Sequence, residues 1–191
     1  MHLNRYIDHT LLKATATTSD IVKLCQEAIT NDFFSVCVNS GYVSLAAEQL
    51  KHSNVKVCSV IGFPLGAMST QAKAAEATEA LKSGANEIDM VMNLGFLKSK
   101  NFDSVWKDIQ AVKSVMPNNT LKVILETCYL SNEEILKASE LAIKGGADFI
   151  KTSTGFGTRG ASLEDVKLMK DIAKDSTKIK ASGGIKDAKT A

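Results

Sequence analysis

The chain has 191 residues, of which 45% are hydrophobic and 23% are charged, and its formal net charge is +2. This composition is typical of a globular protein with enough apolar residues for one core, so we expect a single domain over residues 1–191. The sequence shows neither the run of about 18 apolar residues that a membrane helix needs nor a secretion signal. We therefore expect a cytoplasmic protein with no membrane partner, and the nearly balanced charge gives no reason to expect nucleic acid.

Seven short segments rich in apolar or β-branched residues have the pattern of buried strands. They cover residues 5–8, 33–38, 55–61, 87–92, 121–125, 149–151 and 178–181. The six later segments recur about every 30 residues, which is the length of a strand–helix–strand unit. They therefore predict a parallel sheet with right-handed connections.

Helical patterns fill the intervals between these strands. They cover residues 18–29, 41–50, 71–81, 102–116, 131–143 and 162–172. Thr18 or Ser19 is expected to cap the first helix, and Ser131 with Glu134 forms a capping box for the fifth. Gly84 follows the third helix, as a C-terminal glycine often does.

Both an open doubly wound sheet and a closed TIM (β/α)8 barrel fit this alternation of strands and helices. The strand count favours the barrel, because seven units are followed at 187–191 by a segment that resembles the start of a helix. The expected fold is α/β, a TIM (β/α)8 barrel that lacks the last strand and helices at the C-terminus. A complete barrel usually takes about 250 residues.

The four cysteines give no indication of a metal site. They are Cys25, Cys37, Cys58 and Cys128, and none of them forms a C-x-x-C pair or stands beside a cluster of histidines. Their spacing therefore predicts no zinc site. We expect reduced thiols and interpret all four as small buried hydrophobic residues.

Charged residues collect where the predicted strands end, which is the edge at which both folds bind ligands. Asp8 follows the first predicted strand, Asp89 lies in the fourth, and Lys151 and Lys180 end the last two. Glu126 follows the fifth strand. These residues form the candidate site.

Alternate residues of a strand share a face, so two of these candidate residues each have a charged alternative on the same face of their strand. Lys178 shares a face with Lys180, and Glu87 shares one with Asp89. Lys178 and Glu87 both lie nearer the N-terminal ends of their strands, away from the expected site. We therefore choose Lys180 and Asp89.

Two lysines at the ends of successive strands suggest covalent chemistry. Either lysine alone is as well explained by an ammonium that reaches water or pairs with an acid. Together, Lys151 and Lys180 raise the cost of protonating both, so one pKa is expected to fall from about 10.4 toward neutrality. A neutral amine is what Schiff-base formation with a carbonyl substrate requires.

Two glycine-rich loops follow these lysines. Residues 155–160 match G-x-G-x-x-G between a predicted strand and a predicted helix, which leaves a nicotinamide-binding function open. The next strand ends in Lys180, where an acid for the ribose is expected in such a protein. Backbone N–H groups of this loop and of residues 182–184 suit a phosphate, and ordinary glycine turns are the plainer alternative.

Six ordered segments carry a resemblance to a known family. They are residues 7–13 (IDHTLLK), 60–66 (VIGFPLG), 87–93 (EIDMVMN), 122–127 (KVILET), 149–156 (FIKTSTGF) and 180–184 (KASGG). Together they resemble the deoxyribose-phosphate aldolase family, and the similarity extends from Asn4 to the last residue.

The resemblance implies a TIM barrel and a class I aldolase that uses no metal and no cofactor. Its reaction is the reversible cleavage of 2-deoxy-D-ribose 5-phosphate into acetaldehyde and D-glyceraldehyde 3-phosphate, so the partners are small phosphorylated sugars and aldehydes. It implies that Lys151 forms the Schiff base and that Lys180 keeps this amine reactive. It also implies that Asp89 donates and accepts protons.

The resemblance also implies which residues bind the substrate. Asp8 matches an acid that organises the polar site. Four positions match those that hold the substrate and its phosphate: Thr154, Gly155, Gly183 and Gly184. Arg159 stands where many relatives have glycine, and we expect its extra positive charge to favour a phosphate.

The family continues through a further helix, an eighth strand with a phosphate loop, and a last helix. An alternative function is therefore a truncated, weakly active or inactive barrel that binds sugar phosphate. A barrel without one strand has two unpaired sheet edges, so we also expect self-association, for example as a homodimer.

Overall fold

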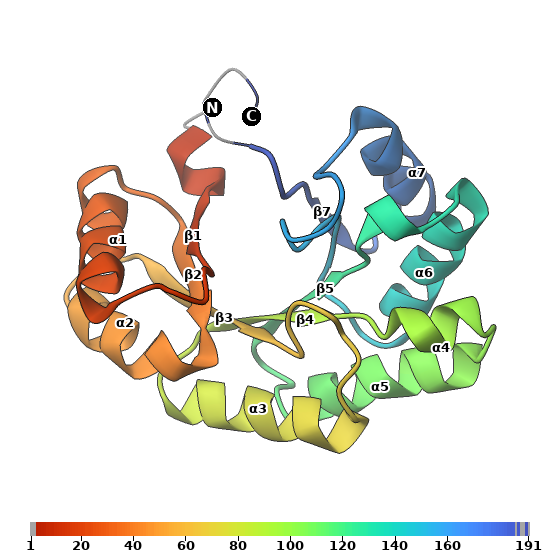
Figure 1. The fold of residues 1–191 in the computed structure, drawn as a ribbon, viewed down its shortest axis with the longest axis horizontal. Helices are drawn as coiled ribbons and strands as arrows, with labels where there is room; N and C mark the ends of the chain where they lie inside the picture. Colours follow the sequence, from red (N-terminus) through yellow and green to blue (C-terminus); the bar gives the residue numbers. More distant parts are fainter. Residues whose placement is uncertain (1–2, 186, 188–189, 191) are drawn as a thin grey trace.

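The computed structural model describes residues 3–185, 187 and 190 and contains a seven-stranded parallel sheet in the order β1 to β7. Its strands are β1 (Asp8–Leu11), β2 (Ser35–Asn39), β3 (Lys56–Ile61), β4 (Glu87–Val91), β5 (Thr120–Ile124), β6 (Phe149–Lys151) and β7 (Lys178–Lys180). The sheet curls and the helices cover its outer side, which gives an incomplete α/β barrel (Figure 1). The predicted barrel topology is confirmed.

Among the residues that the structure describes, seven α-helices lie between the strands. They are α1 (Thr18–Thr30), α2 (Val43–Leu50), α3 (Thr70–Lys82), α4 (Leu94–Lys98), α5 (Phe102–Ser114), α6 (Asn132–Lys144) and α7 (Leu163–Ala173). Three short 3-10 helices accompany them: η1 (Leu3–Tyr6), η2 (Ser40–Tyr42) and η3 (Thr127–Tyr129). The sequence pattern predicts all of the α-helices except α4, whose five residues are too few to show helical periodicity.

The ends of two helices show how local side chains set their bounds. The first helix is capped by Thr17 instead of Thr18 or Ser19, because Thr17 and Asp20 form a reciprocal capping box. The predicted box of Ser131 at the start of α6 is confirmed.

The first strand differs from the prediction. The chain forms η1 where a strand was expected at 5–8, and β1 begins at Asp8. Side chains hold this turn, since the Asn4 amide donates to the backbone oxygen of Asp32 at 3.1 Å and Arg5 pairs with the Asp32 carboxylate at 2.9 Å. Asp8 is therefore the first residue of its strand, and the expectation that it follows the strand is wrong.

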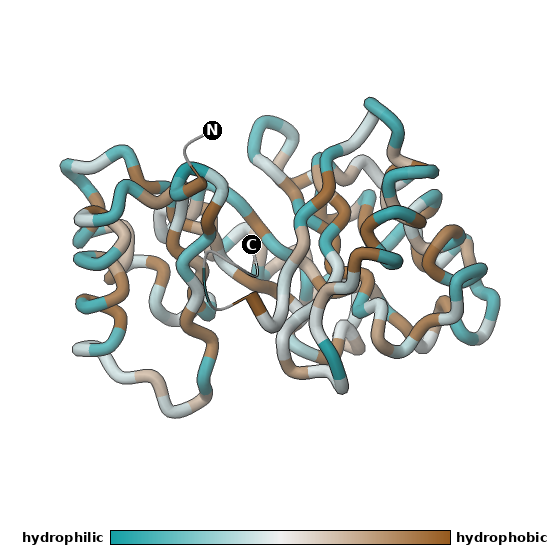
Figure 2. The backbone as a smooth tube through the Cα atoms, turned by 90° about the horizontal axis from the view of Figure 1, so that it is seen from above, coloured by the Kyte–Doolittle hydropathy of each residue, from teal (hydrophilic) through white to brown (hydrophobic). Residues whose placement is uncertain are grey.

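The apolar core lies between the sheet and the helices. On β4, the outward residues Ile88 and Met90 are fully buried and belong to this core, as do Val36 and Val38 of β2. Hydrophobic segments gather along the strands, and hydrophilic segments alternate with them along the outer helices (Figure 2). Because successive strand residues point to opposite faces, the residues between these positions are left for the inner face.

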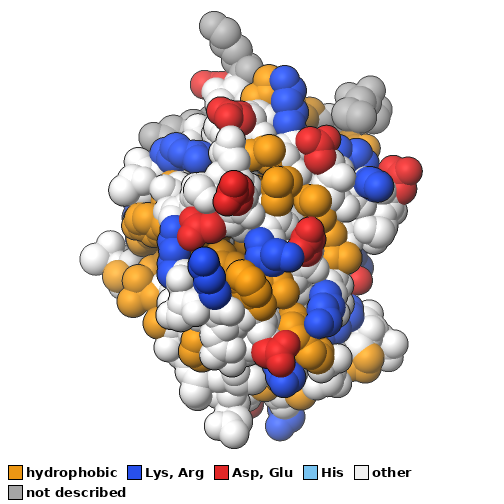
Figure 3. Space-filling view, turned by 90° about the vertical axis from the view of Figure 1, so that its right-hand side faces the viewer, with side chains coloured by type: hydrophobic (Ala, Val, Ile, Leu, Met, Phe, Trp, Pro, Cys, Tyr) orange, Lys and Arg blue, Asp and Glu red, His pale blue; other side chains and the backbone are white. Residues whose placement is uncertain are grey.

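The outer surface carries charges of both signs. On the face that includes α4, α6 and α7, lysine and acidic side chains are interspersed (Figure 3), and Lys98 of α4 pairs with Glu134 of α6 at 2.6 Å. Exposed pairs of this kind contribute only about 0–1 kcal/mol each. Within the described part of the chain, no helix is both long enough and apolar enough to cross a membrane.

A buried ion pair joins two helices to the sheet. The Lys73 ammonium of α3 lies 2.6 Å from the Asp108 carboxylate of α5, and both side chains are almost fully buried. Lys73 also donates to the backbone oxygen of Val91 at the end of β4, at 3.0 Å. Burial lowers the pKa of Lys73, and Asp108 opposes this effect.

We predict that Lys73→Met lowers the free energy of unfolding by about 3–5 kcal/mol, because it leaves the Asp108 carboxylate buried without its cation. Urea denaturation followed by circular dichroism measures this loss. The control is Lys107→Met, which removes an exposed partner of Asp103 and should cost about 1 kcal/mol or less. Equal losses in the two variants would contradict the account.

Candidate active site

Charged side chains occupy the inner face of the sheet and alternate with the core residues along the strands. They are Asp8 of β1, Glu87 and Asp89 of β4, Lys122 of β5, Lys151 of β6 and Lys180 of β7. The strand register brings them together, since Lys122 lies opposite Asp89 and Lys180 lies opposite Lys151. We call these six residues the charge cluster.

Asp89 is the centre of the charge cluster and is fully buried. Its Oδ2 atom accepts a hydrogen bond from Lys151 Nζ at 2.6 Å, and its Oδ1 atom accepts one from Lys122 Nζ at 2.9 Å. Burial by itself raises the pKa of Asp89, but the ammonium groups of Lys122 and Lys151 outweigh it and hold the pKa well below its usual range. Asp89 is therefore a carboxylate with a cation on each oxygen.

The electrostatics of Lys151 differ from the prediction. Burial lowers its pKa, but the contact with Asp89 outweighs burial and raises the pKa above its ordinary value. The expectation that Lys180 shifts this pKa toward neutrality is wrong, because the Asp89 carboxylate in contact with Lys151 favours its charged form. Lys180 itself pairs with Asp8. Asp89 therefore favours the ammonium form of Lys151.

Lys122 is a member of the charge cluster for which the sequence pattern predicts no role. Its ammonium lies 2.6 Å from the Glu87 carboxylate and 3.9 Å from that of Asp8, in addition to its contact with Asp89. Burial lowers the pKa of Lys122, but these carboxylates raise it well above its ordinary value. A lysine inside an otherwise apolar strand, with two acids on the neighbouring strand, is the signal that could have identified it.

Lys180 links the last strand to the first. Its Nζ atom lies 2.9 Å from Asp8 Oδ2 and donates to the backbone oxygen of Tyr6, also at 2.9 Å. The Asp8 carboxylate is 3% exposed and accepts a further hydrogen bond from the Ser35 hydroxyl at 2.8 Å. Asp8 and Lys180 therefore connect β1 and β7, the two edges of the described sheet.

Thr154 is placed by Glu126, which the sequence analysis includes only as a strand-end acid. Glu126 is buried and has a left-handed backbone, with φ of 51°. Its carboxylate accepts hydrogen bonds from the backbone N–H of Thr154, at 3.2 Å, and from the Thr154 hydroxyl. Cys128, which also contacts Glu126, is only partly buried, so the expectation that all four cysteines are buried is wrong for it.

The glycines bring the loops after β6 and β7 together. Gly155, Gly183 and Gly184 all have positive φ values, of 86°, 80° and 81°, which glycine adopts without strain. A Cβ atom on Gly160 would lie 2.1 Å from the backbone oxygen of Gly183, so only glycine allows this approach. The backbone of Gly155 and Gly183 is also close, since a Cβ on Gly183 would lie 3.7 Å from Gly155 Cα.

Arg159 is not a free cation in this structure. Its guanidinium binds the Asp165 carboxylate with two nitrogens, and it also donates to the backbone oxygen of Gly160. Asp165 in turn accepts a hydrogen bond from Thr127 at 2.9 Å. The expected extra charge for a phosphate is therefore neutralised by Asp165.

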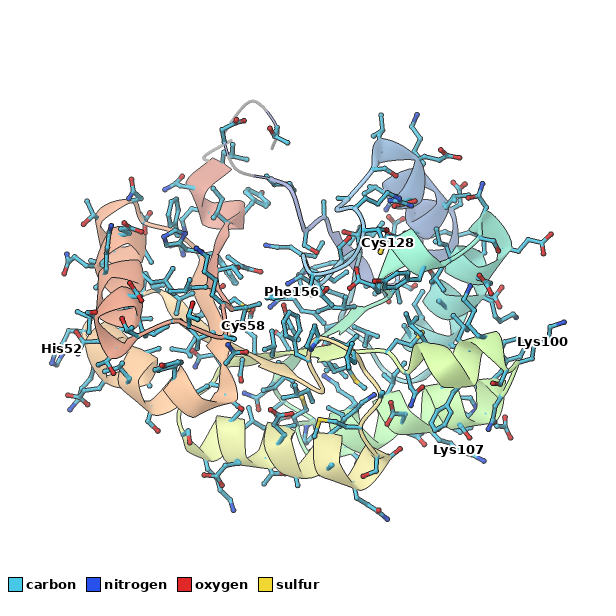
Figure 4. All side chains as sticks on the ribbon, in the orientation of Figure 1. His52, Cys58, Lys100, Lys107, Cys128 and Phe156 are labelled. Carbon is cyan, nitrogen blue, oxygen red and sulfur yellow. The ribbon has the colours of Figure 1, made fainter. Side chains whose placement is uncertain are left out.

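Aromatic side chains connect the loops that follow β3 and β6. The rings of Phe63 and Phe156 meet edge to face with their centroids 5.4 Å apart. Cys58 and Phe156 lie toward the inside of the ring of strands, whereas His52 and Lys107 project from the outside (Figure 4). Because Phe63 follows β3 and Phe156 follows β6, their ring contact places these two loops at the same end of the barrel.

A family model described as DeoC/LacD family aldolase matches residues 3–191. The chain is 61% identical over 185 residues to a deoxyribose-phosphate aldolase of Finegoldia magna, a match that covers 97% of this chain and 87% of the relative. It is 54% identical over 191 residues to a deoxyribose-phosphate aldolase of Brevibacillus brevis, which covers 100% of this chain and 86% of that relative.

Solved structures of similar proteins have the same fold. The aldolase QR15 superposes with a TM-score of 0.94 at 45% identity, over 98% of this chain and 84% of its own. A deoxyribose phosphate aldolase of Aeropyrum pernix, described as a unique tetramer, superposes with a TM-score of 0.90 at 33% identity, over 98% of this chain and 80% of its own.

We predict that Glu126→Ala frees the loop that begins at Thr154. The backbone amide of Thr154 should exchange its hydrogen roughly 10- to 100-fold faster, as expected when a hydrogen bond to a charged group worth about 1.5–3 kcal/mol is lost. Amide hydrogen exchange measures this rate. The matched control is Glu133→Ala at the exposed start of α6, and the same acceleration at Thr154 in both variants would refute the role of Glu126.

Proposed function

The chain belongs to the DeoC/LacD family of aldolases, and from that premise we propose that it reversibly cleaves 2-deoxy-D-ribose 5-phosphate into acetaldehyde and D-glyceraldehyde 3-phosphate. In this proposal Lys151 forms a Schiff base with the substrate. The observation that carries it is the buried contact of 2.6 Å between Lys151 Nζ and Asp89 Oδ2, inside the charge cluster. A lysine that becomes a nucleophile once its proton leaves is in contact there with a carboxylate that can accept this proton.

Schiff-base formation begins when the Lys151 ammonium loses a proton and its amine attacks the substrate aldehyde. Asp89 is the acceptor in contact with this ammonium. The proton that Asp89 has accepted then leaves with the carbinolamine hydroxyl as water. This step restores the Asp89 carboxylate and gives an iminium, which carries the same positive charge as the ammonium it replaces. The Asp89 carboxylate that raises the pKa of Lys151 therefore also stabilises the iminium.

Carbon–carbon cleavage follows from the same arrangement. The iminium accepts the electron pair of the breaking bond, and a base removes the proton of the sugar hydroxyl so that D-glyceraldehyde 3-phosphate leaves. We assign this proton, and the later protonation of the enamine carbon, to Asp89. Hydrolysis of the remaining iminium releases acetaldehyde and returns Lys151 to its ammonium form.

We assign supporting roles to two pairs of residues. Lys180 and Asp8 hold the edges of the sheet on either side of the site, and the contact of 2.9 Å between them supports this role. Lys122 and Glu87 balance the charge beneath Asp89, and the contact of 2.6 Å between them supports it. In this proposal Lys180 acts on Lys151 by keeping Asp8 occupied, which leaves Asp89 as the acid nearest the nucleophile.

We assign the phosphate of the substrate to the two glycine loops. Backbone N–H groups at Gly155, Gly183 and Gly184 are suited to bind an anion. A Cβ atom on Gly155 or Gly184 would meet nothing within 4 Å, so the space beside these two glycines is open. Thr154 lies beside them and is oriented by Glu126.

The other functions that the sequence leaves open are not favoured. A nicotinamide-binding protein is not favoured by the family, nor by Lys180 at the position where a ribose-binding acid is expected. A barrel that binds sugar phosphate without catalysis is less favoured than an aldolase, because the relatives named above are aldolases. Self-association, a cytoplasmic location and the lack of any cofactor stay predictions, and the tetramer described for the Aeropyrum pernix relative supports the first.

We predict that borohydride traps the substrate covalently on Lys151. The protein is incubated with 2-deoxy-D-ribose 5-phosphate, reduced and digested, and the modified peptide is identified by mass spectrometry. The adduct should be confined to Lys151 and absent from Lys151→Ala, whereas the exposed Lys170→Ala control should keep it. A folded wild-type sample without an adduct, or with an adduct on another lysine, would overturn the proposed function.

A further inference from the structure

Two cysteines that the proposed reaction does not use, Cys37 and Cys58, form a cluster with Asp89 on the inner face of the sheet. Their ligand atoms, the two Sγ atoms and a carboxylate oxygen, all lie within 4.8 Å of one another, and the three residues are fully buried. We propose that this thiol site (Cys37, Cys58 and Asp89) binds one thiophilic divalent ion of the zinc or cadmium class. A bound ion then blocks Schiff-base formation, so the site is inhibitory and supplies no cofactor.

The strand register creates the thiol site. Cys37 of β2 lies directly opposite Cys58 of β3, and Asp89 of β4 lies opposite Val60, two residues along the same face from Cys58. The sequence spacing gives no C-x-x-C motif, so only the parallel pairing of β2, β3 and β4 reveals the donors as neighbours. Two thiolates and a carboxylate are donors that zinc accepts, and a site with three protein donors leaves a fourth position for water.

The donor atoms already contact one another and a cation. The Cys58 thiol donates to Asp89 Oδ1 at 3.1 Å, and the Lys122 ammonium lies 2.9 Å from the same oxygen and 3.4 Å from Cys58 Sγ. An ion that takes Asp89 Oδ1 leaves Lys122 with Glu87, whose carboxylate is 2.6 Å away. The ion therefore adds to the cluster without leaving a buried lysine unpaired.

Binding of the ion leaves the net charge of the charge cluster and the two thiols unchanged. With both thiols protonated, the charge cluster contains three carboxylates and three ammonium groups. When the ion binds, two S–H bonds break, two metal–sulfur bonds form and two protons leave to solvent. One doubly charged ion thus replaces two protons, and the net charge of this buried region does not change.

A bound ion inhibits the reaction because Asp89 is both a ligand of the ion and the acceptor for the proton of Lys151. A metal bond to Asp89 Oδ1 draws electron density from the carboxylate and leaves Oδ2 a poorer acceptor for the proton of Lys151. This part of the inference rests on the proposed function, whereas binding of the ion does not. The experiment therefore measures the two separately.

Cadmium is the probe, because its thiolate complexes absorb in the ultraviolet without any enzyme assay. The reduced protein is titrated with Cd²⁺, and with Mg²⁺ as an ion that prefers oxygen donors. The wild type should bind one Cd²⁺ with thiolate absorption, and Cys37→Ser and Cys58→Ser should weaken binding by roughly 100-fold or more, since losing even an outer partner costs 10- to 100-fold. The control Cys25→Ser removes a buried thiol of α1 outside the cluster and should bind as the wild type does.

Cadmium NMR of the wild type provides a second reading that needs no variant, because the chemical shift reports how many sulfur atoms bind the ion. Two sulfur donors support the thiol site, and one or none overturns it. Borohydride trapping in the presence of Cd²⁺ then tests inhibition, where loss of the Lys151 adduct supports it and an undiminished adduct contradicts it. If trapping fails without any metal, the proposed function has failed and the absorption and NMR results still decide the binding site.

Discussion

The buried contacts of Asp89 with Lys151 and Lys122 constrain the rest of the inner face. A carboxylate at the centre of the barrel needs cations, and each buried lysine then needs further acids to balance it. Glu87 and Asp8 supply these acids, so three carboxylates face three ammonium groups. Removing Asp89, Lys122 or Lys151 therefore leaves an opposite charge buried without its partner.

Because of this constraint, the apolar residues that stabilise the fold and the charged residues of the site lie on opposite faces of the sheet. Residues such as Ile88 and Met90 point outward and pack under the helices, whereas Glu87 and Asp89 alternate with them and point inward. The sheet therefore keeps its apolar packing on one side while the other side holds charges that an apolar core does not tolerate. The Lys180–Asp8 pair extends the same network to the two edge strands and links the ends of the sheet.

Much of the fold and part of the site can be predicted from the sequence. The regular recurrence of β-branched segments predicts six of the strands, because period and spacing are local properties. The role of Lys122 could not be predicted in this way, since its partners Asp89 and Glu87 come from another strand and depend on register. The sequence predicts the wrong direction for the pKa of Lys151 for the same reason: it places two lysines on successive strands but does not show that each has its own acid.

The charge state of Lys151 is the most direct test of this account. Neutron diffraction from a deuterated crystal at neutral pH, without ligand, locates the deuterons on Lys151 and on Asp89. A buried ion pair between these residues requires three deuterons on Lys151 Nζ and none on either oxygen of Asp89. Two deuterons on Lys151 Nζ, or a deuteron on the Asp89 carboxylate, would contradict the claim that this buried ion pair organises the site.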